Sequence, residues 1–168
     1  DLPGDLLWDI LPDTDTSMRI AVDSKPLVQY NPVSKLFHYF DFKQYLKENN
    51  IEFTPVYHSI LKILKKSPTE LWLATTEGIF SFNKGTGNFK LEYGVALDNI
   101  NYFYYDSGSQ KLYCSDEREK LYIYDGKTGE MKILSKDAFA GINKSLRPYS
   151  LPGQAIFVPG NGGLALIN

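Results

Sequence analysis

The stretch LWLATTEGIFSFNKGTGNFKLEY, residues 71–93, contains three runs of β-branched, aromatic and other apolar residues separated by two short turns. Runs of this kind, bounded by Gly-, Asn- and Thr-containing turns, are typical of antiparallel strands joined by hairpins. The second turn, Gly85-Thr86-Gly87, has the small residues that tight turns favour. The stretch therefore predicts a β-meander.

The same pattern recurs in other parts of the chain. Residues 112–134 repeat it, with a GKTG turn in place of KGTG, and residues 19–39 form a third copy. A truncated fourth copy covers residues 156–168. The equivalent positions are Tyr30, Phe82, Tyr124 and Ile167, which are 52, 42 and 43 residues apart. In the same alignment, the position of Trp72 is held by Ile20, Tyr113 and Phe157. A period of about 40 to 50 residues is typical of β-propeller blades.

One more apolar run precedes each copy and supplies a fourth strand. These runs are Leu6–Leu11, Ser59–Leu64, Asn101–Tyr105 and Ser145–Ser150. The longer first interval is explained by DFKQYLKENN, residues 41–50, in which Asp41 is a capping residue and Phe42, Tyr45 and Leu46 have helical spacing. We therefore predict an all-β chain: a partial β-propeller of about 3.5 four-stranded antiparallel blades with a short helical insertion.

The expected organisation is a single propeller segment over residues 1–168. Its parts are blade 1 at 6–40, the helical insertion at 41–50, blade 2 at 58–93, blade 3 at 100–134 and an incomplete blade 4 at 145–168. A blade buries its faces against its neighbours, so a segment of this length leaves open flanks. We expect the remaining blades of a longer parent chain, or a second copy in a homodimer, to cover these flanks.

The composition excludes several classes of function. A hydrophobic fraction of 43% is enough to bury a core, and an aromatic fraction of 14% favours β-structure. Eighteen basic residues against 20 acidic ones leave a net charge of −2, so no nucleic-acid partner is expected. No run reaches the roughly 20 apolar residues of a membrane helix, so we expect no membrane contact by this segment.

The second copy carries a family resemblance. Leu71–Thr75, Gly78–Asn83 and Gly85–Phe89 resemble the two-component regulator propeller repeat, which has an apolar-Trp-apolar-Gly-Thr strand, a Gly-Leu-x-x-Tyr-Asp strand and a Thr-Gly-x-Phe turn. Ala74 stands where that repeat has Gly. The resemblance covers nearly the whole chain. It implies the periplasmic sensor region of hybrid two-component histidine kinases, often from gut bacteria that respond to glycans.

The resemblance implies a non-enzymatic, periplasmic sensor segment that contributes blades to the sensing of a ligand, such as a glycan or another small molecule, and to signal transmission. A protein-interaction scaffold is an alternative, but the WD-repeat and kelch signatures do not recur in the copies. A propeller enzyme, a lyase or a glycosidase, is a further alternative. The equivalent positions of the copies share no acidic residue that would support it.

The reactive residue types have ordinary structural explanations. His38 and His58 lack a His-Glu-x-x-His pattern, and Cys114 lies inside a predicted strand, where a small buried hydrophobe is expected. The acidic stretches at Asp9, Asp13 and Asp15 and at 116–119 lack the spacing of an EF-hand and predict solvated turns. We predict no catalytic residue, no metal and no cofactor. Trp72 is expected in the core between blades.

A ligand face would lie on the loops between the second and third strands of each blade and on those leading to the next blade. In propellers these loops gather around the mouth of the channel, and loops commonly carry binding residues. The candidate ligand-binding residues are Asp23, Lys25, Thr75, Thr76, Glu77, Asp116, Glu117, Arg118 and Asn161.

Overall fold

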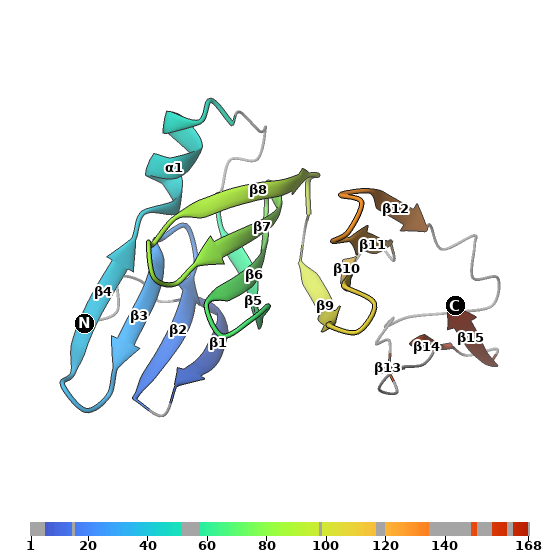
Figure 1. Ribbon diagram of the computed structural model, residues 1–168, viewed down its shortest axis with the longest axis horizontal. Helices are drawn as coiled ribbons and strands as arrows, with labels where there is room; N and C mark the ends of the chain where they lie inside the picture. Colours follow the sequence, from blue (N-terminus) through green and yellow to red (C-terminus); the bar gives the residue numbers. More distant parts are fainter. Residues whose placement is uncertain are drawn as a thin grey trace. The chain divides into compact units, whose positions relative to one another are not determined.

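The computed structural model describes residues 6–14, 16–51, 58–97, 99–116, 120–134, 149–150, 156–160 and 163–167. The chain divides into two compact units, Asp1–Leu97 and Asp98–Asn168, and each is described by itself. Figure 1 shows the strands of both units and the helix of the first.

The first unit contains two four-stranded sheets with the orders β1-β2-β3-β4 and β5-β6-β7-β8. Each strand pairs antiparallel with the next along the chain, so both sheets are meanders. The strands of the first sheet are β1 (Leu7–Thr14), β2 (Ser17–Val22), β3 (Leu27–Asn31) and β4 (Leu36–Phe40). Those of the second are β5 (Ile60–Lys65), β6 (Glu70–Thr75), β7 (Gly78–Asn83) and β8 (Phe89–Gly94).

The second unit contains a further four-stranded meander and a three-stranded sheet. The four strands are β9 (Ile100–Asp106), β10 (Lys111–Asp116), β11 (Leu121–Asp125) and β12 (Met131–Leu134). The three are β13 (Tyr149–Ser150), β14 (Ile156–Gly160) and β15 (Gly163–Ile167). Three complete sheets and one with three strands confirm the predicted all-β fold of about 3.5 antiparallel blades.

The short helix α1 (Phe42–Glu48) follows β4, as predicted for the insertion. Asp41 caps it, since its Oδ1 accepts a hydrogen bond from the Gln44 backbone N–H at 2.9 Å. Phe42 and Leu46 are buried, and the Phe42 ring lies edge-on to Phe80 of β7 with centroids 5.1 Å apart. The helix is therefore held to the second sheet by its apolar side.

The core of the first unit lies between its two sheets. Side chains alternate between the faces of a strand, so Leu71 and Leu73 of β6 share one face, and Trp72 and Ala74 share the other. Leu71 and Leu73 belong to one buried cluster with Ala21 of the first sheet. The other buried members of this cluster are Leu27, Phe42, Leu46, Ile60, Ile63, Phe80, Phe82 and Phe89.

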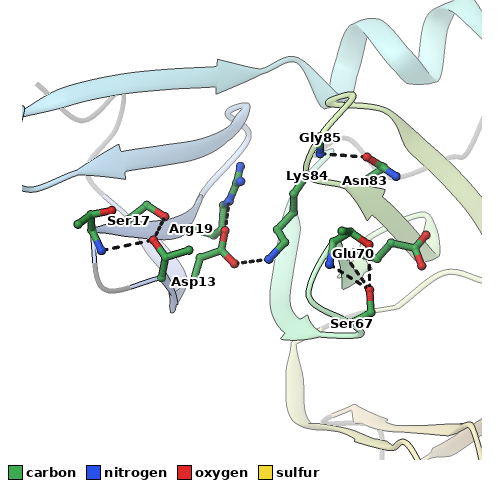
Figure 2. Close-up of polar contacts among 11 residues, drawn as sticks. Asp13, Ser17, Arg19, Ser67, Glu70, Asn83, Lys84 and Gly85 are labelled. Carbon is green, nitrogen blue, oxygen red and sulfur yellow. Dashed lines mark hydrogen bonds and ion pairs between the residues drawn. The ribbon is translucent and has the colours of Figure 1, made fainter.

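The turn between the third and fourth strands has the same design in three sheets. The last residue of the third strand is Asn31, Asn83 or Asp125, and its side-chain oxygen accepts backbone N–H bonds from the residues two and three positions later. For Asn83 these bonds are 3.0 Å from Gly85, shown in Figure 2, and 2.9 Å from Thr86. Such side-chain turns satisfy backbone donors locally and explain why the repeat keeps Asn or Asp here.

The pairing register corrects one part of the repeat alignment. Phe82, Tyr124 and Ile167 pair with Leu71, Leu112 and Ile156, in agreement with the aligned positions. Tyr30 instead pairs with Met18, and its neighbour Gln29 pairs with Arg19. The position of Trp72 is therefore held in the first sheet by Arg19, and the assignment of Ile20 to it was wrong. The loop from β2 to β3 is longer than the one from β6 to β7, which displaced the alignment.

Candidate functional site

The loops after β2 and β6 are joined through Ser59, a buried residue just before β5. The Ser59 hydroxyl donates to Asp23 Oδ1 at 2.9 Å and accepts from the Ser24 backbone N–H at 2.9 Å. Its backbone N–H donates to Thr76 Oγ1 at 3.1 Å, and its carbonyl accepts from the Thr76 N–H at 3.0 Å. Two of the predicted loops thus meet at one serine.

Asp23 is also bonded to the indole of Trp8. The Nε1–H of Trp8 donates to the same Oδ1 at 3.0 Å. This oxygen therefore accepts two hydrogen bonds, and the backbone N–H of Asp23 donates to the Leu6 carbonyl at 2.9 Å. These bonds give Asp23 a role in joining the first strand of the sheet, the β2–β3 loop and the second sheet. Trp8 uses the polar edge of its indole for this bond.

Glu77 lies beneath the loop surface rather than on it. Its side chain is 0% exposed, and Oε1 is hydrogen-bonded to Nδ1 of His58, whose side chain is 34% exposed. Among the described residues no group donates to Oε2. A buried carboxylate is tolerated when a partner compensates for its lost hydration, and His58 is that partner. The pair holds the imidazole in a defined orientation at the same end of the sheet as Ser59.

Thr75 is also fully buried and shapes the turn before β7. Its Oγ1 accepts from the backbone N–H groups of Glu77 and Gly78, both at 3.1 Å, and donates to the Gly78 carbonyl at 3.1 Å. Gly78 has a φ of 144°, and a Cβ there would lie 2.2 Å from the Tyr93 carbonyl oxygen. This residue must be glycine because the β8 backbone approaches so closely. Thr76 is the partly exposed residue of this turn.

The remaining predicted ligand residues fall into three groups. Lys25 is exposed on the β2–β3 loop. Asp116, in the second unit, is buried; its Oδ1 accepts from the Lys120 N–H at 3.1 Å and its Oδ2 from the Tyr122 hydroxyl at 2.9 Å. Glu117, Arg118 and Asn161 lie outside the described residues. The structure thus brings Asp23 and Thr76 together, places Glu77 on His58, and gives Thr75 and Asp116 internal hydrogen bonds.

Sequence reasoning missed His58 and Ser59 as parts of this loop network. A signal for His58 is present in the strand register: Ile60 pairs with Thr75, and two further residues along each strand bring His58 opposite Glu77. A histidine facing a glutamate across an antiparallel pair is a candidate ion pair. The pairing could have been inferred once the two strands were aligned as neighbours.

A second polar cluster lies between the two sheets of the first unit, at Asp13, Arg19 and Lys84 (Figure 2). Asp13 Oδ2 accepts from Arg19 Nε at 3.0 Å, and its Oδ1 accepts from Lys84 Nζ at 2.6 Å. The three side chains are only 4%, 3% and 13% exposed, respectively. The prediction that Asp13 is a solvated turn residue was therefore wrong, because two cations from β2 and from the β7–β8 turn enclose it.

The environment of this cluster explains the ionised state of Asp13. Burial by itself would raise the pKa of this carboxyl, but the hydrogen bonds and charges of Lys84 and Arg19 outweigh burial and hold the pKa below its ordinary value. The Arg19 guanidinium lies 5.3 Å from the ring centroid of Phe40 and 5.5 Å from that of Phe82. These contacts allow an arginine to occupy the position that Trp72 has in the second sheet.

Two further residues have the environments expected from the sequence. Trp72 is buried, with the Lys66 ammonium 4.3 Å from its ring centroid, which confirms its place in a core. Cys114 is buried, and burial, together with the charge of Asp116, raises the pKa of its thiol. No three His, Cys, Asp or Glu residues of the described ranges are grouped so as to hold a metal ion. The helix that the structure describes is too short to cross a membrane.

The consecutive four-stranded antiparallel meanders define the chain as a protein of the β-propeller class. Among solved structures, the extracellular domain described for the hybrid two-component system BT3049 of B. thetaiotaomicron matches 100% of this chain and 23% of its own length, with a TM-score of 0.72 and 20% identity. The corresponding domain of BT4673 matches 98% of this chain and 21% of its own, with a TM-score of 0.70 and 16% identity. The WD40 propeller domain of Doa1 matches 97% of this chain and 50% of its own length, with a TM-score of 0.67 and 11% identity.

These likenesses establish the fold. The chain spans less than a quarter of the two extracellular domains. No protein-family model and no curated protein matches the sequence.

Proposed function

We propose that this chain is a non-enzymatic segment of the periplasmic sensor region of a hybrid two-component regulator. It contributes propeller blades to the binding of a ligand, a glycan or another small molecule, and to transmission of the signal to other parts of the parent chain. The observation that carries the proposal is the match of the complete chain to part of an extracellular domain of such a system, at a TM-score of 0.72. The repeat motif of residues 71–93 supports the same class independently.

Ligand contact is proposed at the end of the sheets where the β2–β3 and β6–β7 loops meet. Lys25 is exposed there, and Thr76 and His58 are partly exposed. These groups supply an ammonium, a hydroxyl and an imidazole, which can hydrogen-bond a polyhydroxylated ligand. Thr75, Glu77 and Asp23 support this surface from beneath through their internal bonds. Asp116, Glu117, Arg118 and Asn161 remain candidate ligand residues of the second unit.

The class of protein is tested by the complete reading frame that encodes this chain. We expect a signal sequence, further propeller repeats, a membrane span and a histidine kinase domain in the same polypeptide. A reading frame without kinase and membrane-spanning parts would refute the proposal. The remaining blades encoded there are the proposed partners that cover the flanks of this segment.

Ligand binding is tested by calorimetric titration of the parent sensor region with oligosaccharides released from starch, pectin and mucin. Replacement of Lys25 by Ala or of Thr76 by Val is expected to weaken binding about tenfold, the equivalent of one hydrogen bond to a charged or polar group. The matched control is Lys47→Ala, which removes an exposed lysine from α1. If the Lys25→Ala and Lys47→Ala variants bind the oligosaccharide with equal affinity, the ligand does not contact Lys25.

A further inference from the structure

The last strand of the first sheet, β4, has the properties of an edge strand that can pair with a further strand. Its sequence, LFHYF, contains no acidic or basic residue other than His38. Its pairing with β3 runs from Leu27–Phe40 to Asn31–Leu36 without a register shift, so the strand has no bulge. Leu36 is 68% exposed, and Tyr39 is also exposed. Within the described part of the chain, no strand pairs with the outer side of β4.

The last strands of the other two complete sheets are protected. β8 carries Lys90 and Glu92 and has a register shift against β7. The hydroxyl of Tyr45, on α1, accepts a hydrogen bond from the Leu91 backbone N–H at 3.3 Å and so covers part of that edge. β12 carries Lys132. Charged side chains, bulges and covering elements are the features by which sheet edges avoid further pairing, and β4 differs from β8 and β12 in having an uncharged, regular strand.

A shallow hollow of about 360 Å³ adjoins the same strand. It is lined by Gln29, Asn31, Ser34, Leu36, Phe37 and His38. A strand added to the edge of β4 would place alternate side chains beside this hollow, which is how strand addition gains specificity. The rings of Tyr30 and Phe37 are stacked with centroids 4.6 Å apart, and those of Phe37 and Tyr39 are stacked with centroids 6.4 Å apart.

We propose that β4 pairs antiparallel with β4 of a second copy of this chain, about a two-fold axis at His38. In this register Leu36 lies opposite Phe40 of the second copy, Phe37 lies opposite its Tyr39, and His38 lies opposite its counterpart. The strand is self-complementary because the Leu36–Phe40 and Phe37–Tyr39 pairs are apolar or aromatic on both sides, and aromatic pairs stabilise neighbouring strands. The aromatic stack continues across the axis. Because of the two-fold axis, each contact occurs twice: Leu36 of either copy lies opposite Phe40 of the other, as an isologous interface requires.

The register is tested by disulfide formation in the purified chain. In His38→Cys the two thiols lie on directly opposite residues, with Cβ atoms about 5 Å apart. In the matched variant Leu36→Cys the two cysteines are offset by four residues, about 13 Å, which is too far for a disulfide. Cys114 is buried and does not compete. We expect at least tenfold more cross-linked dimer from the residue-38 variant, and equal yields, or none from that variant, would overturn the pairing.

The interface itself is tested by sedimentation velocity over a concentration series. Leu36→Lys should raise the dimer dissociation constant at least tenfold, because it places charges in the new pairs, whereas Ile133→Lys on β12, also an exposed position, should leave it unchanged. Ile10→Lys distinguishes edge pairing through β4 from a dimer that forms through the open faces of the sheets. Ile10 lies opposite Ile20 in the β1–β2 pair, on a sheet face. Loss of the dimer in the Ile10→Lys variant alone would overturn the proposal. A wild-type chain that stays monomeric up to roughly 0.5 mM would also overturn it. So would a wild-type chain that binds extended peptides of unrelated sequence but not a second copy of itself.

Discussion

Replacing Asp13 with Asn tests the ion cluster that joins the two sheets of the first unit. The change keeps the size of the side chain and removes the charge that compensates Arg19 and Lys84, which lie 3.0 and 2.6 Å from the carboxylate oxygens. Removing one member of a buried ion pair costs about 3 to 5 kcal/mol, because the remaining charges stay buried without compensation. Asp13 bonds the Nε of Arg19, and the buried Nη1 of the same guanidinium has no hydrogen-bond partner among the described residues, so the loss of Asp13 is harder to replace.

We expect a loss near the lower limit, about 3 kcal/mol in the free energy of unfolding. Lys84 is 13% exposed and can turn its ammonium toward water, and the Asn amide oxygen still accepts one hydrogen bond from Arg19. Lys84→Met leaves Asp13 paired with Arg19 and should cost about 1.5 kcal/mol, the value of a charged hydrogen bond. The double variant should show a coupling of about 1 kcal/mol between the two positions, as contacting residues do.

The assay is urea denaturation at pH 7, with Lys90→Met as the matched control. Lys90 is 72% exposed, and its partner Glu92, which is 9% exposed, keeps its contacts with Ser81 and Lys66 when Lys90 is removed, so the change in stability should be less than about 0.5 kcal/mol. The pKa of folded Asp13 is lowered from 3.8, so its contribution is complete above that value and is lost as the pH falls through the lower folded pKa. The difference between wild type and Asp13→Asn should therefore shrink below about pH 4. A loss under about 1 kcal/mol at pH 7, or one equal to the control, would refute the buried ion cluster.

Two other predictions follow from burial. Trp72→Ala should lower the free energy of unfolding by about 3 to 5 kcal/mol, because the indole is almost completely buried, and a change below about 1 kcal/mol in urea denaturation would contradict its core position. The Cys114 thiol should react with a disulfide reagent at pH 8 only after unfolding, because burial and the Asp116 charge raise its pKa; rapid labelling of the native chain would contradict this.

The sequence predicted the strands and their order because these depend on local patterns that the repeats share. The Asn31, Asn83 and Asp125 turns and the aromatic third strands align across the copies, and Asp41 marks the start of the helix. The register of the first copy was wrong by one residue because the loop from β2 to β3 is longer than the loop from β6 to β7, which displaced the alignment. Arg19 is acceptable there only through Asp13, a partner from another strand, which no local pattern shows.

The candidate ligand loops were predicted as positions along the chain, but their burial was not. Glu77 and Thr75 occupy a turn that usually faces solvent, and polar residues in such turns are expected to be exposed. Their burial depends on contacts between distant segments: His58 bonds to Glu77, and the β8 backbone lies against Gly78. Propensity and periodicity describe neighbours along the chain, so the His58–Glu77 contact could be inferred only after β5 and β6 were aligned as neighbouring strands.

The ion cluster is a contact specific to the first and second copies. The residue after the turn-forming Asn or Asp is Lys84 in the second copy, but Pro32 in the first and Gly126 in the third. A lysine that reaches Asp13 is therefore supplied by the second copy and by neither of these two. If the second sheet lacked this lysine, Asp13 would be paired with Arg19 alone, and the contact between the two sheets would be weaker. The shared strand pattern specifies a blade, and the charged residues Asp13 and Lys84, which lie outside that pattern, add a contact that the first two blades alone can form among the described copies.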